Sequence, residues 1–255
     1  MLRKELAIKL LKSRMHGAPS HKQGHIKYGK YHINYTDMLS LYIEYKDIFI
    51  REIYRPNTTK SAPIIIDGGS CIGISVLYFK LLYPNAKIIC FEPDPEIYKI
   101  LQQNITQNNI ADTELVMSGL AETTGVAYFE PDGSDGGKIV DANKSTQINV
   151  VKLSDYITTH VDFLKLNIEG KELPVLLEIE SANKLKDIDE LVIEYHGWYN
   201  DTQKLGDILN LLARNGFRYM IHDFDSETNG VTKPPFHLMP NTTWFCLIYA
   251  TKVNP

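Results

Sequence analysis

From residue 63 onward, short runs of β-branched residues alternate with longer stretches that carry apolar side chains on one face. Near-continuous apolar runs are typical of buried parallel strands, whereas apolar positions three or four residues apart indicate helices. Strands that alternate with helices indicate an α/β fold with a Rossmann-like, doubly wound and mostly parallel sheet. The pattern predicts strands at 64–66, 87–91, 114–117, 161–167 and 190–195, and helices at 74–83, 95–108, 171–177 and 205–215.

Four further segments are predicted to be strands, and two of them are expected to run antiparallel. Residues 217–221 and 244–250 are expected to pair as a C-terminal antiparallel hairpin, which completes a seven-stranded sheet. Two further strand candidates, 125–130 and 146–153, flank a glycine-rich loop. This loop, at 132–138, is a candidate lid over a ligand site.

The domain organisation follows from the same pattern. Residues 61–255 are expected to form one domain, because no repeat or linker divides them. Residues 1–60 lack the regular alternation and are expected to form an N-terminal extension. It is interpreted as a helical segment packed on the domain, a lid or an oligomer contact. The first 11 residues are basic and amphipathic without a cleavage site, which favours a helix over a signal peptide.

Composition and charge narrow the class of protein. Of the 255 residues, 44% are hydrophobic and 23% are charged, and the net charge is −4. This composition is that of a globular protein, and the charge predicts no nucleic-acid partner. No apolar run is long enough to predict a membrane span. The three cysteines, Cys71, Cys90 and Cys246, match no zinc spacing, and we expect a reducing, cytoplasmic location.

The turn after the first predicted strand is a candidate cofactor loop. Neither Gly68 nor Gly69 is followed two residues later by another glycine, so the Gly-x-Gly-x-x-Gly fingerprint of dinucleotide-binding proteins is missing. The phosphate-binding Gly-x-x-x-x-Gly-Lys loop is absent as well. The run from Asp67 to Gly73 reads Asp-x-Gly-x-x-x-Gly, which resembles the first motif of S-adenosylmethionine-dependent methyltransferases.

A carboxylate follows the second predicted strand. Glu92 stands where an acidic side chain can accept hydrogen bonds from both hydroxyls of a ribose. Residues 118–121, after the third strand, are expected to border an adenine ring. The predicted cofactor-binding residues are Asp67, Gly68, Gly69, Ser70, Ile72, Gly73, Glu92, Pro93, Ser118, Leu120 and Asn167.

Several motifs together resemble a known family over residues 45–200. They are the glycine turn, the Phe-Glu-Pro-Asp-Pro run at 91–95, Asn104 with Asn108 and Asn109, the stretch at 164–172 and the Val-Ile-Glu-Tyr-His run at 192–196. In these motifs the chain is similar to the FkbM-type methyltransferases. It departs from their Lys-x-Asp-x-Glu-Gly-x-Glu motif at Asn167, where aspartate is usual. The resemblance implies a Rossmann-like fold, S-adenosylmethionine as methyl donor and O-methylation of a sugar or natural-product hydroxyl.

Two pairs of polar residues follow predicted strands and are candidates for the chemistry. Asn167 and Glu169 are two residues apart, as are Glu194 and His196, so each pair projects to one side of an extended chain. We predict Glu169, His196 and Asn167 as catalytic residues, with His196 favoured as general base. Glu169, Glu194 and His196 also suit a divalent metal such as Mg, Mn or Fe. The alternatives are that Glu169 caps a helix, Glu194 pairs with a lysine such as Lys165, and His196 is hydrogen-bonded in a turn.

The sequence hypothesis is an S-adenosylmethionine-dependent O-methyltransferase. Its predicted acceptor is a sugar hydroxyl, for example on a nucleotide-linked sugar such as a GDP-heptose in capsule or surface-polysaccharide biosynthesis. The alternatives are a methyltransferase for a natural-product hydroxyl, a nicotinamide-dependent oxidoreductase and a non-catalytic cofactor-binding subunit. A small molecule is the expected partner, and a homo-oligomer is left open. Asp223, Asp225 and His237 are further residues considered for the acceptor side, with solvated loop positions as the alternative.

Overall fold

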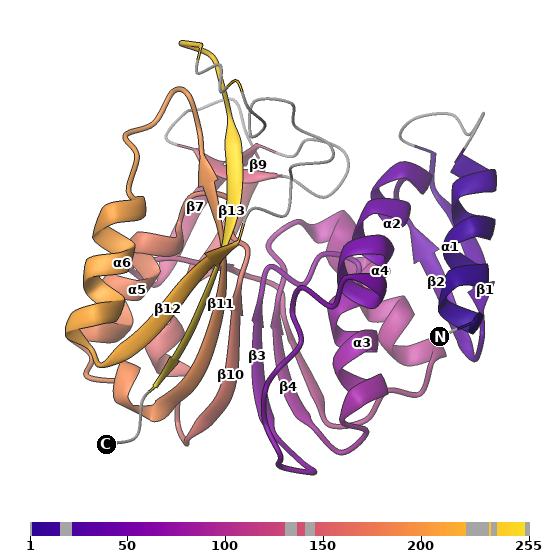
Figure 1. The fold of residues 1–255 in the computed structure, drawn as a ribbon, viewed down its shortest axis with the longest axis horizontal. Coiled ribbons are helices and arrows are strands. Elements are labelled where there is room, and N and C mark those ends of the chain that lie inside the picture. Colours follow the sequence, from indigo (N-terminus) through magenta and orange to yellow (C-terminus); the bar gives the residue numbers. More distant parts are fainter. Residues whose placement is uncertain are drawn as a thin grey trace.

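A seven-stranded sheet forms the centre of the computed structural model (Figure 1). The structure describes residues 2–15, 22–130, 137–140, 146–222, 235 and 239–252. The strands stand in the order β12-β13-β11-β10-β3-β4-β5. Their bounds are β3 (Ile64–Gly68), β4 (Lys87–Phe91), β5 (Thr113–Val116), β10 (Val161–Leu166), β11 (Ile188–Gly197), β12 (Phe217–His222) and β13 (Trp244–Lys252).

The order in which the chain adds strands to the sheet reverses in the middle of the sheet. β3 pairs in parallel with β4 on one side and with β10 on the other, and β10 pairs in parallel with β11. β13 is antiparallel to both β11 and β12, so the second strand of the expected C-terminal hairpin lies inside the sheet. The order of the first five strands is that of a doubly wound sheet, in which ligands bind where the winding reverses, here between β3 and β10.

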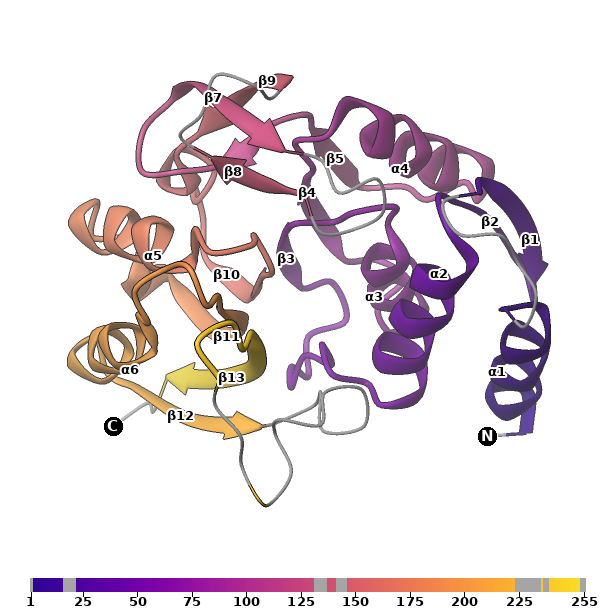
Figure 2. The ribbon, with the colours of Figure 1, turned by 90° about the horizontal axis from the view of Figure 1, so that it is seen from above.

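Helices cover both faces of this sheet (Figures 1 and 2). Helices α3 (Ile74–Leu82) and α4 (Pro95–Gln107) pack on one face, and α5 (Glu172–Ser181) and α6 (Leu205–Arg214) pack on the other. Neighbouring strand residues alternate between these two cores, because successive side chains of a strand point to opposite faces. For example, Ile65 belongs to the core under α3, whereas Ile66 belongs to the core under α5.

A separate four-stranded sheet follows β5. Its order is β6-β9-β7-β8, and it has a small core of its own that includes Phe129 and Ile148. The strands are β6 (Gly119–Leu120), β7 (Gly125–Glu130), β8 (Lys138–Val140) and β9 (Thr146–Val151). The sequence predicted β7 and β9 without placing them, and did not predict the short strands β6 and β8. Most of the candidate lid at 132–138 lies outside the described residues.

The N-terminal extension is folded into the main core. It contains α1 (Leu2–Met15), the hairpin of β1 (Gly24–Tyr28) and β2 (Tyr31–Tyr35), α2 (Met38–Tyr45) and the π-helical turn η1 (Lys46–Ile50). Only its first helix was predicted. Ile33 and Phe49 are buried in the core that holds α3.

None of the helices within the described ranges has both the length and the apolar character needed to cross a membrane.

A buried asparagine joins the extension to the rest of the chain. Asn104 on α4 accepts a hydrogen bond from the Asn34 amide at 2.7 Å and donates to the Asn34 carbonyl at 2.9 Å. The same side-chain amide donates to the carbonyl of Ile72, in the glycine turn, at 2.8 Å. One of the asparagines in the family resemblance therefore connects β2, α4 and the turn after β3.

Candidate active site

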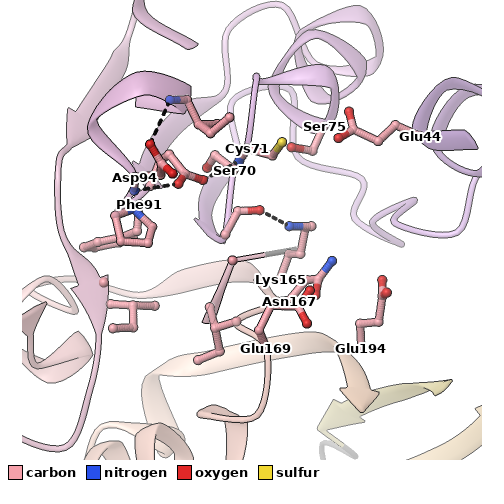
Figure 3. A pocket seen from close by; sticks show the side chains of 18 of the residues that line it. Glu44, Ser70, Cys71, Ser75, Phe91, Asp94, Lys165, Asn167, Glu169 and Glu194 are labelled. Carbon is pink, nitrogen blue, oxygen red and sulfur yellow. Dashed lines mark hydrogen bonds between the residues drawn. The ribbon is translucent and has the colours of Figure 1, made fainter. Parts of the chain in front are cut away.

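A cavity of about 370 Å³ opens where the winding of the sheet reverses (Figure 3). Its walls come from the segments that follow β3, β4, β5 and β10, which all end at the same edge of the sheet. Residues of α2, η1 and the small sheet complete it. This position is the usual ligand site of an open α/β sheet.

The turn after β3 requires glycine at one position. Gly69 has a φ of +82°, and a Cβ placed there would lie 1.9 Å from the carbonyl oxygen of Asn167. The amides of Gly69 and Ser70 donate to the carbonyl of Phe91 at 3.1 and 2.9 Å. The close approach to β10 and the bonds to β4 together fix the turn, and its backbone borders the cavity.

Asp67 and Lys165 form a buried ion pair beneath the turn. The Lys165 Nζ lies 2.9 Å from Asp67 Oδ1 and donates to the Gly69 carbonyl at 2.7 Å. The hydroxyl of Ser75 donates to the other Asp67 oxygen at 2.5 Å. Asp67 is fully buried and does not line the cavity. Its position indicates that it holds the turn through Lys165, a residue that the sequence analysis did not assign to the site.

Glu92 presents a buried carboxylate to the cavity. Its two oxygens accept hydrogen bonds from the amides of Cys71, at 3.0 Å, and Asp94, at 2.9 Å. Burial raises the pKa of the Glu92 carboxyl to about 8. A carboxylate oxygen has a second lone pair, so Glu92 can still accept hydrogen bonds from a ligand.

The turn after β10 is held by a buried glutamate. Glu169 and Gly170 have φ values of +54° and +99°. The amides of Ile168 and Gly170 both donate to Glu172 Oε1 at 3.2 Å. Burial raises the pKa of the Glu172 carboxyl. Glu172 thus stabilises the left-handed turn, and the Glu169 side chain lines the cavity.

Asn167 also lines the cavity, beside Glu169. Within the described part of the chain, its Oδ1 is buried and receives no hydrogen bond. A buried amide oxygen without a donor is costly, so a ligand donor at this position would be favourable.

His196 lies behind two carboxylates and does not itself line the cavity. Its Nε2 is 3.4 Å from Glu169 Oε2 and 3.7 Å from Glu194 Oε1. The imidazole stacks on Trp198, and burial lowers the pKa of His196, which favours the neutral ring. The imidazole can therefore orient the two glutamates, whereas a bound acceptor would meet the glutamates first.

Tyr54 connects the N-terminal extension to this group. Its hydroxyl donates to Glu194 Oε2 at 2.6 Å, and the Lys165 Nζ lies 5.0 Å from the centre of its ring. Burial, followed by the nearby charge of Glu194, raises the pKa of Tyr54. Lys165, the partner considered for Glu194, is paired with Asp67.

The ligand atoms of Glu169, Glu194 and His196, the three residues predicted to bind a metal, do not all lie within 4.8 Å of one another. Across the described residues, the only three His, Cys, Asp or Glu side chains with ligand atoms all within 4.8 Å of one another are His160, Asp162 and Asp189. These lie at the start of β10 and β11, the opposite edge of the sheet from the cavity.

The structure brings most of the predicted cofactor-binding residues to the cavity. Those that line it are Gly69, Ser70, Glu92, Pro93, Ser118, Leu120 and Asn167. Those that do not line it are Asp67, Gly68, Ile72 and Gly73. Lining residues that the sequence analysis did not single out include Ile43, Glu44, Asp47, Tyr54 and Phe245. Asp223, Asp225 and His237 lie outside the described residues.

The fold and the cavity define the class of protein. A doubly wound sheet with a glycine turn after β3 and an acidic residue after β4 is typical of enzymes that bind a nucleoside cofactor. The family model described as methyltransferase FkbM domain matches residues 67–219, which is more than half of the chain. The chain belongs to this family and is a methyltransferase.

Two relatives agree with this assignment, and a solved structure is similar in fold. Methyltransferase sdnD from Sordaria araneosa is 27% identical over 179 residues, which cover 54% of this chain and 69% of that protein. Methyltransferase 1 from Beauveria bassiana (strain ARSEF 2860) is 28% identical over 178 residues, which cover 59% of this chain and 71% of that protein. The crystal structure of methyltransferase FkbM from Methylobacillus flagellatus KT is similar in fold, with a TM-score of 0.50 and 18% identity. The match covers 97% of this chain but spans only 59% of that structure.

Proposed function

We propose that this chain transfers a methyl group from S-adenosylmethionine to a hydroxyl of a small acceptor, with a sugar as the acceptor class. The observation that carries the proposal is the cavity where the sheet reverses, with the Glu92 carboxylate on one wall and Glu169 on another. The family resemblance supports the sugar hydroxyl. A nucleotide-linked sugar in polysaccharide assembly is the more specific form of this hypothesis.

The residues around the cavity fit a nucleoside cofactor. Glu92 would hold the ribose hydroxyls through the free lone pairs of its carboxylate. The glycine turn brings the backbone of Gly69 to the wall of the cavity, where a ligand can approach it closely. The buried Asn167 oxygen would accept a hydrogen bond from a donor group of the cofactor or the acceptor.

The chemistry requires an electrophile and a proton acceptor. When bound, S-adenosylmethionine supplies a methyl group on a positively charged sulfur. We assign the Glu169 carboxylate to take the proton that the acceptor oxygen loses as its bond to carbon forms. His196, 3.4 Å from Glu169 Oε2, would hold this carboxylate in place. The hydrophobic walls formed by Phe129, Ile139 and Phe245 would exclude water from the reacting oxygen.

The residues do not fit the predicted metal. A divalent ion needs ligand atoms that converge on one point. The ligand atoms of Glu169, Glu194 and His196 are too far from one another to do so. We therefore assign no step to a metal. Turnover of chelator-treated enzyme should equal that of untreated enzyme, and restoration of lost activity by added Mg, Mn or Fe would reinstate the metal hypothesis.

The donor and the acceptor need separate tests. Isothermal titration with S-adenosylhomocysteine tests the donor site, and the absence of binding would sink the proposed function. Mass spectrometry of a panel of free, amine-bearing and nucleotide-linked sugars, incubated with protein and S-adenosylmethionine, tests the acceptor. A gain of one methyl group on any panel member supports a sugar acceptor, and methylation of a non-sugar hydroxyl compound alone would replace it.

The affinity for S-adenosylhomocysteine should increase with pH. A ribose hydroxyl donates to a carboxylate more strongly than to a carboxylic acid, and the pKa of Glu92 is about 8, so binding weakens as the pH falls below 8. We expect a loss of up to about tenfold per pH unit between 8 and 6. Glu92→Gln removes the titrating group, so its affinity should be lower at pH 9 and nearly independent of pH. An equally steep profile in this variant would assign the pH dependence to another group.

Glu169→Gln should separate catalysis from binding. Glutamine keeps the size of the side chain but cannot take up a proton, so we expect kcat to fall by about 10²- to 10⁴-fold. The affinity for S-adenosylhomocysteine should change little, because the cofactor wall is intact. Glu180→Gln is a matched control on the exposed side of α5, where Glu180 binds Arg214. If Glu169→Gln kept the wild-type kcat, the role of proton acceptor would belong to another residue, and Glu194 would be the first to examine.

A further inference from the structure

Charge is distributed unevenly along this chain. Residues 1–36 contain eight lysines and arginines and one acidic residue, whereas residues 37–255 contain 19 basic and 30 acidic residues. The net charge of −4 therefore combines +7 in the first segment with −11 in the rest of the chain. The overall charge thus conceals a strongly basic N-terminal segment.

This basic segment forms one end of the molecule. Helix α1 and the hairpin of β1 and β2 lie side by side, at the opposite end from α6 and β12 (Figures 1 and 2). Their apolar side chains, such as Leu11, Ile26 and Ile33, are buried in the core that holds α3. The six described basic side chains of this segment are all exposed, and we call them the basic end: Lys9, Lys12, Arg14, Lys22, Lys27 and Lys30.

Within the part of the chain that the structure describes, no carboxylate forms an ion pair with a side chain of the basic end. Among the described residues from 37 onward, by contrast, at least eight lysines and arginines are paired with a carboxylate, as Lys99 is with Glu96 and Arg214 with Glu180. Exposed charges of one sign add to a positive potential that attracts anions from a distance. The basic end is therefore suited to an extended anionic partner.

The residue types of the basic end favour a lipid surface over a nucleic acid. Five of its six side chains are lysines, which attract anionic headgroups as point charges. Arginine, which reads phosphates and base edges through paired hydrogen bonds, occurs there once. Single-stranded nucleic acids need exposed aromatic rings for stacking, but Tyr31 of the hairpin is buried and Tyr28 and Tyr35 are half-buried.

Two leucines in the same part of the fold are exposed as well. Leu10 lies between Lys9 and Lys12 on α1 and is 45% exposed. Leu39 is 50% exposed on α2, the helix that packs against α1. A bilayer removes such side chains from water at the boundary between headgroups and acyl chains, whereas a phosphodiester backbone offers them no apolar contact. Stable attachment to a membrane needs two contributions, and charge and leucine side chains supply both here.

We propose that the basic end docks on a membrane surface that contains anionic lipids, with Leu10 and Leu39 entering the headgroup boundary. The rest of the chain, with its charge of −11, is repelled by the same surface, so the protein meets the membrane in one orientation. The docking surface is separate from the cavity and does not depend on the proposed function.

Vesicle flotation of the full chain tests the proposal. Vesicles of phosphatidylcholine alone are compared with vesicles that contain about 30% phosphatidylglycerol, at about 0.1 M salt. We expect partitioning to the anionic vesicles to be at least about tenfold stronger than to the neutral ones. Raising the salt to about 1 M should release the protein, because the screening length then falls to about 3 Å.

Two variants and a matched control assign the effect to this surface. Lys27→Gln combined with Lys30→Gln removes two charges and should weaken partitioning to anionic vesicles by about tenfold. Leu10→Ser should weaken it severalfold. Lys87→Gln combined with Lys186→Gln removes two exposed lysines outside the basic end and should change partitioning little.

Three results would overturn the proposal. The first is equal partitioning to neutral and anionic vesicles, or none to either. The second is an equal loss in the two double variants, which would assign the effect to the overall charge of the protein. The third is binding to duplex DNA at the same salt without binding to anionic vesicles, which would make the basic end a nucleic-acid interface.

Discussion

Gly69→Ala is expected to lower turnover by about 100-fold and to weaken S-adenosylhomocysteine binding, because the new methyl group would overlap the backbone of Asn167, directly after β10. The Cβ would lie 1.9 Å from the Asn167 carbonyl oxygen, which belongs to the backbone and cannot turn away. The turn or the end of β10 must move, and both border the cavity. Titration calorimetry and a methyl-transfer assay measure the two effects.

Gly216→Ala is the matched control for this variant. Gly216 has a φ of +81°, nearly the same as the +82° of Gly69, but a Cβ there would meet no atom within 4 Å. Both variants pay the cost of alanine in a left-handed conformation, about 1–2 kcal/mol. Only Gly69→Ala also creates the overlap with Asn167. Equal affinity for S-adenosylhomocysteine in the two variants would show that the close approach to β10 has no importance for the site.

Lys165→Met should lower the free energy of unfolding by about 3–5 kcal/mol, the usual cost of leaving a buried charge without its partner. Lys165 and Asp67 are both almost fully buried, with side-chain exposures of 3% and 0%. The variant also removes the hydrogen bond to the Gly69 carbonyl, so the glycine turn loses its support. Urea unfolding measures the loss.

Two further variants show whether the loss comes from the ion pair. Lys165→Met combined with Asp67→Asn removes both charges, and should recover part of the stability that the single variant loses. Lys99→Met removes an exposed lysine of α4 that is bound to Glu96, and should change stability little. A double variant as unstable as Lys165→Met alone would assign the loss to packing rather than to charge.

The sequence predicted the parts of the fold that depend on local pattern. The β-branched run before the glycine turn is β3, and Asp94 accepts hydrogen bonds from the amides of Glu96 and Ile97 at the start of α4. Both features arise from residues a few positions apart, where periodicity and capping are informative. The hairpin of β1 and β2 was not predicted. Its burial depends on packing against α4, far along the chain, where Asn104 exchanges hydrogen bonds with the backbone of Asn34 in β2.

The candidate site was predicted at its turns but not at its long-range contacts. Glu92 and Glu169 were predicted because Glu92 directly follows a strand and Glu169 lies in the turn after another. Asp67 was predicted to face the cofactor, but its partner Lys165 is 98 positions away and draws it beneath the turn. Tyr54 binds Glu194 across 140 positions, and no local pattern connects the two. The sugar acceptor, its place in polysaccharide assembly, the cytoplasmic location and the absence of nucleic-acid partners stay predictions.

The buried side chain of Asn104 makes the first strands of the chain and the glycine turn mechanically continuous. Its amide nitrogen contacts the carbonyl of Asn34 on β2 and the carbonyl of Ile72 in the turn. A ligand that rigidifies the turn thereby also restrains β2, and loosening of β2 relaxes the turn. The N-terminal segment and the domain that the family model matches should therefore unfold together. An N-terminal segment from another protein could replace this one only if it also satisfied the hydrogen bonds of Asn104.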